Sequence, residues 1–237
     1  MKRALFVVAV LLVGLPASAT VRSLQPSDPP FWPAPVLSPE RLAAETVRVD
    51  SRGGGNFDTG TGVGVGAHVA LTNAHLVNDR VTLVTRCDVD TLTSGLVERA
   101  DAGLDLAVVV TNGADLIPIE LADADPVAGQ AVTIAGYPAG VRTIADARIE
   151  GTIARGSGTV LRFSPEPHAG QSGSPLVDAG GRLVGIAYAD DTAGGQGLAI
   201  PVSRVRAALE QWRAAGVPIA SPTEGDTTAA LARTGVC

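Results

Sequence analysis

Three short stretches of the sequence carry residue types that together can perform nucleophilic catalysis. His75 ends Leu71-Thr72-Asn73-Ala74-His75, Asp105 begins Asp105-Leu106-Ala107-Val108, and Ser172 lies in Gly170-Gln171-Ser172-Gly173-Ser174-Pro175. A serine hydroxyl is a poor nucleophile at neutral pH and needs a base within hydrogen-bond reach. An imidazole with a pKa of about 6.5 can take that proton and return it to a leaving group. A carboxylate can hold the imidazole in one tautomer.

Each stretch also has a purely structural interpretation. A histidine at a strand end is usually a surface residue, a turn aspartate often precedes an apolar run, and a lone Ser-Gly pair occurs by chance. Asp101 competes with Asp105 for the carboxylate role, but the apolar run Leu106–Val109 directly follows Asp105. The combination of the three stretches in this order therefore predicts a catalytic site more strongly than any one of them.

The three stretches together resemble the trypsin-like serine proteases, above all the exported bacterial branches. These include the Deg-type proteases, the actinobacterial acid-resistance periplasmic protease and the glutamyl endopeptidases. In such families the base is the histidine of a T-x-A-H sequence, the aspartate begins a D-[LI]-A sequence, and the nucleophile is the serine of G-x-S-G-x-P. The three occur in the order His, Asp, Ser. The similarity extends from about Thr46 to Trp212. It implies that His75 is the general base, Asp105 the orienting carboxylate and Ser172 the nucleophile.

The resemblance also implies an oxyanion hole formed by the backbone N–H groups of Gly170 and Ser172. Ser174 replaces the second glycine of the common G-x-S-G-G-P form, although the glutamyl endopeptidases also use S-G-S-P. We expect this change to alter loop packing without removing activity. The stretch from Thr20 to Arg22 contains no Ile-Val-Gly-Gly sequence, so activation by burial of a new N-terminal amine is not expected.

Substrate preference has three candidate explanations. In the trypsin-like proteases the residue six positions before the nucleophile lies at the base of the side-chain pocket, and here it is Glu166. A carboxylate there would favour Arg or Lys before the cut, unless Pro165 and Pro167 hold Glu166 in solvent. His168 lies four residues before Ser172, where the pocket walls are expected, and is interpreted as a rim or structural residue in preference to a substrate-binding one. Cleavage after Glu is less favoured, because the glutamyl endopeptidases use a histidine downstream of the nucleophile and none follows Ser172. The third explanation is a preference for small or apolar side chains, as in Deg-type proteases.

The elements that must position these residues are short β-type runs separated by Gly, Asp and Asn. Two series of six runs predict an all-β fold of two six-stranded antiparallel β-barrels, with the active site between them. The expected runs are Thr46–Ser51, Gly60–Ala67, Val69–Thr72, Val81–Cys87, Leu92–Ala100 and Leu106–Thr111, then Ala131–Tyr137, Ala147–Ala154, Gly158–Phe163, Pro175–Val177, Arg182–Ala189 and Gly197–Pro201.

Helical patterns occur at both ends of this β-rich region. Residues 40–45 form a candidate short helix with Ser38 as N-cap and Pro39 at the first helical position. Apolar residues at helical spacing predict one C-terminal α-helix over residues 202–215, ended by Gly216. We thus expect a protease domain over residues 46–216, with barrels at 46–118 and 126–201, followed by a tail at 217–237.

The N-terminal segment has the pattern of a secretory signal peptide over residues 1–19. Lys2 and Arg3 precede an apolar run from Ala4 to Leu15, and Ala17-Ser18-Ala19 forms a small-residue cleavage site. The run is shorter than the ~20 residues that span a bilayer, so a membrane anchor is not favoured. Residues 20–45 form a Pro-rich extension. An exported protein, extracellular or periplasmic and not attached to a membrane after cleavage, is expected.

The charge and the cysteine and histidine content limit the kinds of partner and cofactor that are expected. The formal net charge is −6 and no basic run occurs, so a nucleic-acid partner is not expected. Cys87 and Cys237 are the two cysteines, and an even number in an exported chain favours a disulfide bond between them. No histidine lies within five residues of either cysteine, so zinc binding has no support. A monomer without metal or organic cofactor is expected.

These observations predict a secreted serine endopeptidase that hydrolyses protein or peptide substrates through an acyl-enzyme. One alternative is an inactive relative that binds peptides without cutting them. A second is an ester hydrolase of the α/β-hydrolase fold, which needs G-x-S-x-G and a histidine after the serine. No histidine follows Ser172, which excludes that order.

Overall fold

The computed structural model describes residues 37–53, 56–77, 81–86, 92–113, 115–156, 158–191 and 195–220. The predicted signal peptide, residues 20–36 of the Pro-rich extension, residues 221–237 of the tail, and both cysteines lie outside these ranges. Within them, no helix is long and apolar enough to cross a membrane.

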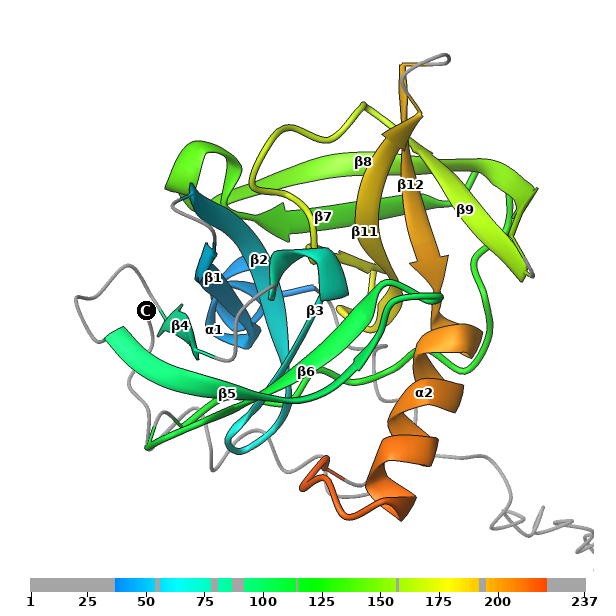
Figure 1. Ribbon diagram of the computed structural model, residues 1–237. Helices are drawn as coiled ribbons and strands as arrows, with labels where there is room; N and C mark the ends of the chain where they lie inside the picture. The colour runs from blue at the N-terminus through cyan, green and yellow to red at the C-terminus, as the bar shows by residue number, and fades with distance from the viewer. Residues whose placement is uncertain are drawn as a thin grey trace, which may run out of the picture. The chain divides into compact units, whose positions relative to one another are not determined.

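The first six strands close into an antiparallel barrel in the order β1-β2-β3-β6-β5-β4 (Figure 1). They are β1 (Thr46–Gly53), β2 (Asn56–Gly66), β3 (Val69–Thr72), β4 (Val81–Arg86), β5 (Leu92–Asp101) and β6 (Leu106–Thr111). Alternate valines of β1, Val47 and Val49, point into a buried cluster with Ala70, Ala107 and Val109. The period-2 pattern of the sequence thus places one face of each strand inside the barrel.

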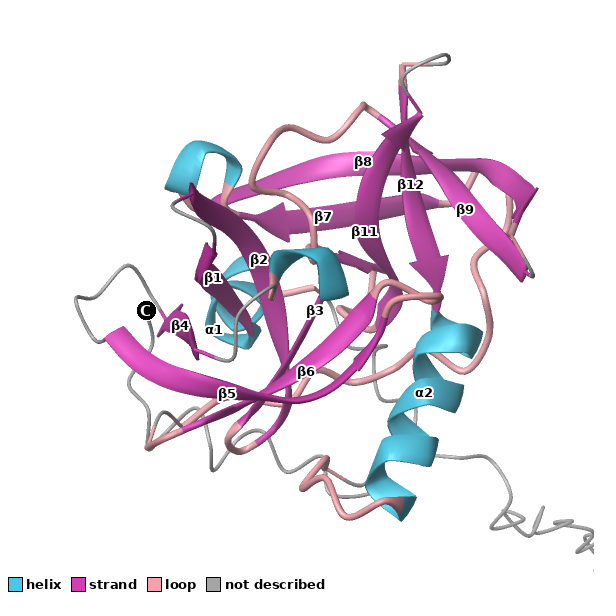
Figure 2. Cartoon of the chain, in the orientation of Figure 1, coloured by secondary structure: helices cyan, strands magenta, loops and turns pink. Residues whose placement is uncertain are grey.

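The last six strands close into a second antiparallel barrel in the order β10-β11-β12-β9-β8-β7 (Figure 2). They are β7 (Ala131–Gly136), β8 (Thr143–Arg155), β9 (Gly158–Ser164), β10 (Pro175–Val177), β11 (Leu183–Asp191) and β12 (Gln196–Pro201). Ile134, Ile149, Leu161 and Phe163 fill its interior. The predicted fold of two six-stranded antiparallel barrels is therefore confirmed.

Two α-helices flank the barrels. In α1 (Pro39–Glu45) the Ser38 side chain accepts a hydrogen bond from the Arg41 N–H at 3.2 Å, as the predicted N-cap requires. The second helix, α2 (Val202–Ala214), follows directly from β12. Its apolar face, which includes Leu209 and Trp212, belongs to a buried cluster that also contains Leu71 of the first barrel and Ile186 of the second. This shared cluster packs the two barrels and α2 against one another.

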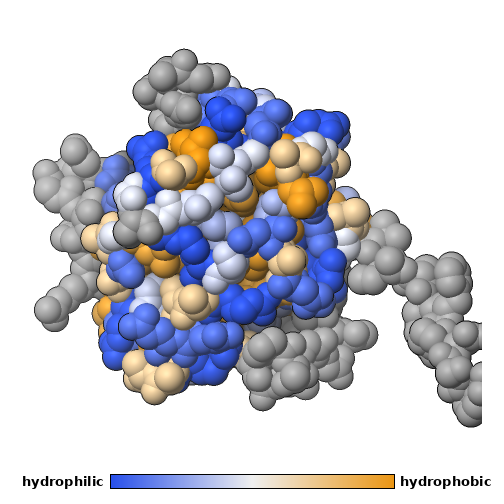
Figure 3. Space-filling model, turned by 90° about the vertical axis from the view of Figure 1, so that its right-hand side faces the viewer, coloured by the Kyte–Doolittle hydropathy of each residue, from blue (hydrophilic) through white to orange (hydrophobic). Residues whose placement is uncertain are grey.

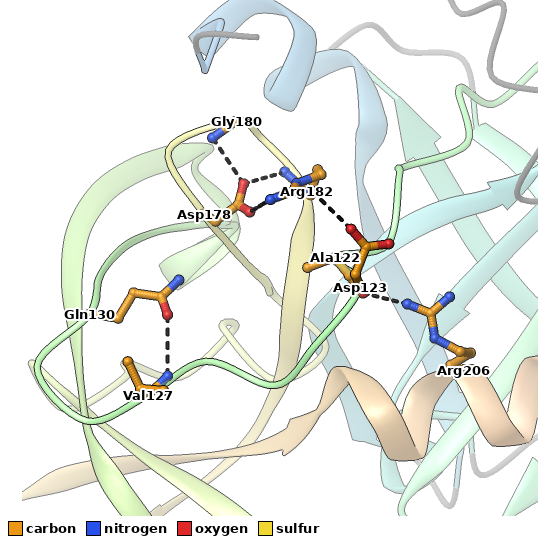
Figure 4. A network of polar contacts seen from close by, with 8 residues as sticks. All are labelled: Ala122, Asp123, Val127, Gln130, Asp178, Gly180, Arg182 and Arg206. Atoms are coloured by element: carbon orange, nitrogen blue, oxygen red, sulfur yellow. Dashed lines mark hydrogen bonds and ion pairs between the residues drawn. The ribbon is translucent and has the colours of Figure 1, made fainter. Parts of the chain in front are cut away.

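The segment between β6 and β7 connects the two barrels, and polar contacts hold this connection against the second barrel and α2 (Figure 4). Asp178 accepts hydrogen bonds from the Gly180 N–H at 2.9 Å and from the Arg182 guanidinium at 2.8 Å. The same guanidinium lies 3.5 Å from the carboxylate of Asp123, and Arg206 of α2 donates to the Ala122 carbonyl. The connection is thus held at two consecutive residues.

The described surface carries its exposed apolar side chains at scattered positions. On the face drawn in Figure 3, hydrophobic residues form small groups among hydrophilic ones. Leu96, Val127 and Val141 are the large apolar residues that are exposed within the described ranges, and they lie on β5, in the connection and in the loop before β8.

Candidate active site

Strand pairing brings His75 and Asp105 together. His75 lies in the short 3-10 helix η1 (Ala74–Leu76), just after β3, and Asp105 lies just before β6. These strands are antiparallel neighbours with Thr72 opposite Ala107, so the end of β3 lies beside the start of β6. The two residues are 30 positions apart in the chain, but their side chains meet at one end of the barrel.

Two hydrogen bonds join Asp105 to His75. The His75 Nδ1 lies 2.8 Å from Asp105 Oδ2, and the His75 backbone N–H donates to Oδ1 at 3.0 Å. A carboxylate at neutral pH only accepts hydrogen bonds, so this contact requires the imidazole proton on Nδ1. Nε2 then keeps its lone pair and can act as a base.

The backbone around Asp105 is held in an unusual conformation. Asp105 has φ +56°, in the left-handed region that few residues other than glycine adopt. Asn73 donates from Nδ2 to the Asp105 carbonyl at 2.9 Å, which fixes this turn. The competing carboxylate, Asp101, instead accepts a hydrogen bond from the Leu104 N–H at 2.9 Å and so caps the same turn. Of the two aspartates, the one in contact with His75 is therefore Asp105.

Ser172 lies on the loop between β9 and β10, which both barrels hold in place. Its carbonyl accepts a hydrogen bond from the Thr61 N–H of β2 at 2.8 Å, and the Gly173 N–H donates to Ala187 of β11 at 2.7 Å. Gly173 has φ +83°, and a Cβ there would overlap the Thr61 carbonyl. Only glycine fits this close approach without displacing the backbone.

Two backbone donors on this loop are left without a partner. The N–H groups of Gln171, Gly173 and Ser174 donate within the protein, to His168, Ala187 and Gln171. Among the described residues, the N–H groups of Gly170 and Ser172 have no acceptor. These two backbone donors, one of them on the serine itself, are thus free to bind an acceptor from outside the loop.

A cleft of about 470 Å³ contains the three predicted catalytic residues. Its lining is formed by His75, Asp105, Pro167, His168, Ala169, Gln171, Ser172, Ala187 and Tyr188. Tyr188 of β11 is partly buried, and this burial raises the pKa of its hydroxyl, which therefore stays protonated at neutral pH. Besides the imidazole–carboxylate pair and the serine, the cleft is thus lined by three small or apolar residues and by three residues with polar side chains, His168, Gln171 and Tyr188.

The structure separates the two predicted substrate-binding residues. His168 lines the cleft, with an exposed side chain. Glu166 is exposed, lies near Gly195 just before β12, and is not part of the cleft lining. Gln171 and Tyr188 line the cleft although no motif in the sequence singled them out. Groups of three or more His, Cys, Asp or Glu side chains that could hold a metal ion do not occur within the described ranges.

Comparison with known proteins identifies a family and solved structures that are similar to this chain. The sequence model of the trypsin-like peptidase domain matches residues 60–186. The active form of the Rv3671c protease from M. tuberculosis superimposes with a TM-score of 0.67 at 22% identity, over 82% of this chain and 95% of that one. The inactive form of the Rv3671c protease gives 0.64 at 24% identity, over 76% and 95%.

A serine endoprotease from Yersinia pestis gives a TM-score of 0.63 at 26% identity, over 74% of this chain and 67% of that one. A search of curated proteins found no match. The likeness to the Rv3671c protease, at less than 25% identity, concerns the fold alone.

Proposed function

Because the chain belongs to the family of trypsin-like peptidase domains, we propose that it is a serine endopeptidase with Ser172 as nucleophile. His75 is the general base and Asp105 orients it. The observation that carries this proposal is the 2.8 Å contact between His75 Nδ1 and Asp105 Oδ2, in the same cleft as Ser172. This geometry supports an imidazole that can accept a proton on Nε2.

The proposed reaction proceeds in two halves. His75 Nε2 takes the proton of Ser172 as its Oγ attacks the scissile carbonyl carbon, and Asp105 stabilises the imidazolium that forms. The N–H groups of Gly170 and Ser172 bind the oxyanion of the tetrahedral intermediate. His75 then protonates the leaving amine, which departs and leaves an acyl-enzyme. His75 takes a proton from water, which attacks the acyl carbon. The bond from that carbon to Ser172 Oγ then breaks, His75 returns the proton to Oγ, and the carboxylic acid product is released.

We propose further that the enzyme prefers a small or apolar side chain before the cut. Pro167, Ala169 and Ala187 line the cleft beside Ser172, whereas Glu166 is exposed. Hydrolysis rates of matched peptides with Val, Arg or Glu at that position test this preference. A faster rate for Arg that is lost in Glu166→Gln would instead assign specificity to Glu166.

The proposed site of action is outside the cytoplasm, which rests on the signal-peptide pattern of residues 1–19. N-terminal sequencing of the protein after expression in a bacterial host should give Thr20 as the first residue. A chain that retains Met1, or is found in the cytoplasm, would contradict export.

The disulfide between Cys87 and Cys237 also remains a proposal, since both residues lie outside the described ranges. Alkylation of the unreduced protein followed by mass spectrometry should find no free thiol. Two alkylated cysteines would exclude the bond.

Casein or peptide hydrolysis tests the activity itself. Ser172→Ala and His75→Ala should each abolish cleavage while the far-UV circular dichroism spectrum stays that of the wild type, because triad residues act as one unit. If the wild type binds peptides but neither it nor the variants cleave them, the alternative of a peptide-binding relative holds.

A further inference from the structure

Thr61 of β2 makes hydrogen bonds through every polar group that it has, although no motif in the sequence draws attention to it. Its hydroxyl donates to the Gly170 carbonyl at 2.8 Å and accepts from the Tyr137 N–H at 3.0 Å. Its N–H donates to the Ser172 carbonyl at 2.8 Å, and its own carbonyl accepts from the Thr72 hydroxyl at 2.6 Å. The residue is fully buried. One threonine of the first barrel thus binds two residues of the serine loop and one of the loop after β7.

The carbonyls of residues 169–172 are all hydrogen bonded, and Thr61 supplies two of the four donors. Ala169 accepts from the Ala139 N–H at 3.1 Å and Gln171 from the Ser174 N–H at 3.0 Å, whereas Gly170 and Ser172 accept from Thr61. In a trans peptide the C=O and N–H groups point in opposite directions. The unused N–H groups of Gly170 and Ser172 therefore point opposite to the carbonyls of Ala169 and Gln171, and Thr61 holds the carbonyls of the peptides that adjoin them.

The hydroxyl is the polar group of Thr61 that a substitution removes, because the backbone N–H and carbonyl remain with any side chain. It connects the Gly170 carbonyl with the Tyr137 N–H, and Tyr137 begins the turn whose Ala139 N–H binds Ala169. The fit is close, because a Cβ at Gly136 would come within 3.0 Å of the Thr61 hydroxyl oxygen. A side chain that can both donate and accept at this point holds the serine loop and the loop after β7 together.

We propose that the Thr61 hydroxyl is a positioning group for the oxyanion hole: it holds the loop 169–172 so that the N–H groups of Gly170 and Ser172 converge. This inference rests on the proposed serine endopeptidase function and adds a residue to it. Thr61 is fully buried and is not among the residues that line the cleft, so it acts through the loop. Because oxyanion donors bind the tetrahedral state more strongly than the substrate, its loss should lower kcat and leave KM nearly unchanged.

Thr61→Val tests this role, because valine keeps the branched shape and removes the hydroxyl. Thr61→Ser restores a hydroxyl and serves as the rescue. Thr46→Val is the matched control: Thr46 is also fully buried in the first barrel, and its hydroxyl donates to a backbone carbonyl, that of Leu42, at 2.7 Å. Should Thr61→Val fail to fold, Thr61→Ala removes the same hydroxyl with less steric demand.

The measurements are kcat and KM on a peptide substrate, inhibition by a peptide boronate, and the melting temperature. Removal of an oxyanion donor costs roughly 10²–10³ in kcat, so misplacing the loop should cost about tenfold to a hundredfold. Binding of the boronate, whose tetrahedral form places an oxygen in the hole, should weaken by the same factor. Thr61→Ser should stay within about threefold of the wild type, and Thr46→Val should lower the melting temperature without changing kcat.

The outcomes separate this inference from the function on which it rests. A wild type that cleaves the peptide, beside a folded Thr61→Val or Thr61→Ala with wild-type kcat, overturns the positioning role alone. Equal losses of kcat in Thr61→Val and Thr46→Val would also overturn it, since the effect would then be general destabilisation. A wild type that neither cleaves peptide nor reacts with a fluorophosphonate overturns both.

Discussion

Replacement of Glu45 by glutamine should stabilise the protein at about pH 8 and leave its stability near pH 4 almost unchanged. Glu45 is the last residue of α1, and its side chain is 1% exposed. Burial raises the pKa of its carboxyl from an ordinary value of 4.5 to about 7, which the Arg41 guanidinium at 2.8 Å opposes and Glu120 reinforces. Above about pH 7 the buried wild-type carboxyl is therefore charged, and this charge lowers the free energy of unfolding.

The sign and size of the effect follow from proton linkage. Between pH 4.5 and about pH 7, the folded protein keeps a proton that the unfolded chain has lost. The free energy of unfolding then falls as the pH rises, because the folded state binds more protons. The contribution of Glu45 is fully present below pH 4.5 and lost as the pH rises to about 7. At about 1.4 kcal/mol for each pKa unit, the loss amounts to about 3 kcal/mol.

Equilibrium unfolding in urea, repeated at pH values from about 4 to 8, measures this contribution. The difference between Glu45→Gln and the wild type isolates Glu45 from all other titrating groups. It should rise from near zero to about 3 kcal/mol, or roughly 6–12 °C in melting temperature. Glu210→Gln is the control, because it makes the same chemical change on the exposed side of α2.

The opposite result would refute the reasoning. A glutamine variant that is less stable than the wild type at about pH 8 would mean that the ion pair with Arg41 outweighs the cost of burial. A difference that does not vary with pH would mean that Glu45 titrates alike in the folded and unfolded chains.

Three further substitutions have defined outcomes. Asp105→Asn should lower kcat by about 10⁴-fold, because the amide no longer selects the Nδ1–H tautomer of His75; steady-state kinetics measures this, and a loss below tenfold would contradict the orienting role. Gly173→Ala should cost at least about 1–2 kcal/mol for the left-handed backbone alone, so thermal unfolding should show a clear loss, whereas an unchanged melting temperature would refute the close approach to Thr61. Ser174→Ala should raise the free energy of unfolding by about 1 kcal/mol, since the buried Ser174 hydroxyl has no hydrogen-bond partner among the described residues. A lower free energy of unfolding in urea would instead mean that this hydroxyl is hydrogen bonded in the folded protein.

Much of the fold could be predicted because short apolar runs end at clear breakers. β3, β6 and β10 have the predicted bounds, and each is a nearly continuous buried run. β8 begins at Thr143 rather than at the predicted Ala147, because residues 143–146 pair with β7 although they are polar or only half-buried. Backbone pairing without burial leaves no hydrophobic signal in the sequence.

The candidate site also contains some residues that the sequence could identify and others that it could not. His75, Asp105 and Ser172 stand in local motifs, so the sequence alone could nominate them. Thr61 lies 109 positions before Gly170, and its contact depends on how the two barrels pack. Tyr188 enters the cleft from β11 with nothing in its neighbourhood to mark it. Residues that act through long-range contacts become visible only in the folded protein.

Labelling with a fluorophosphonate probe tests the central claim most directly. The wild type should take up one probe molecule, and mass spectrometry of the digested protein should place it on Ser172. Ser172→Ala and the urea-denatured wild type should take up none, since reactivity depends on the folded arrangement with His75. A folded wild type that stays unlabelled, or that carries the probe on a different serine, would contradict the assignment of Ser172 as the nucleophile.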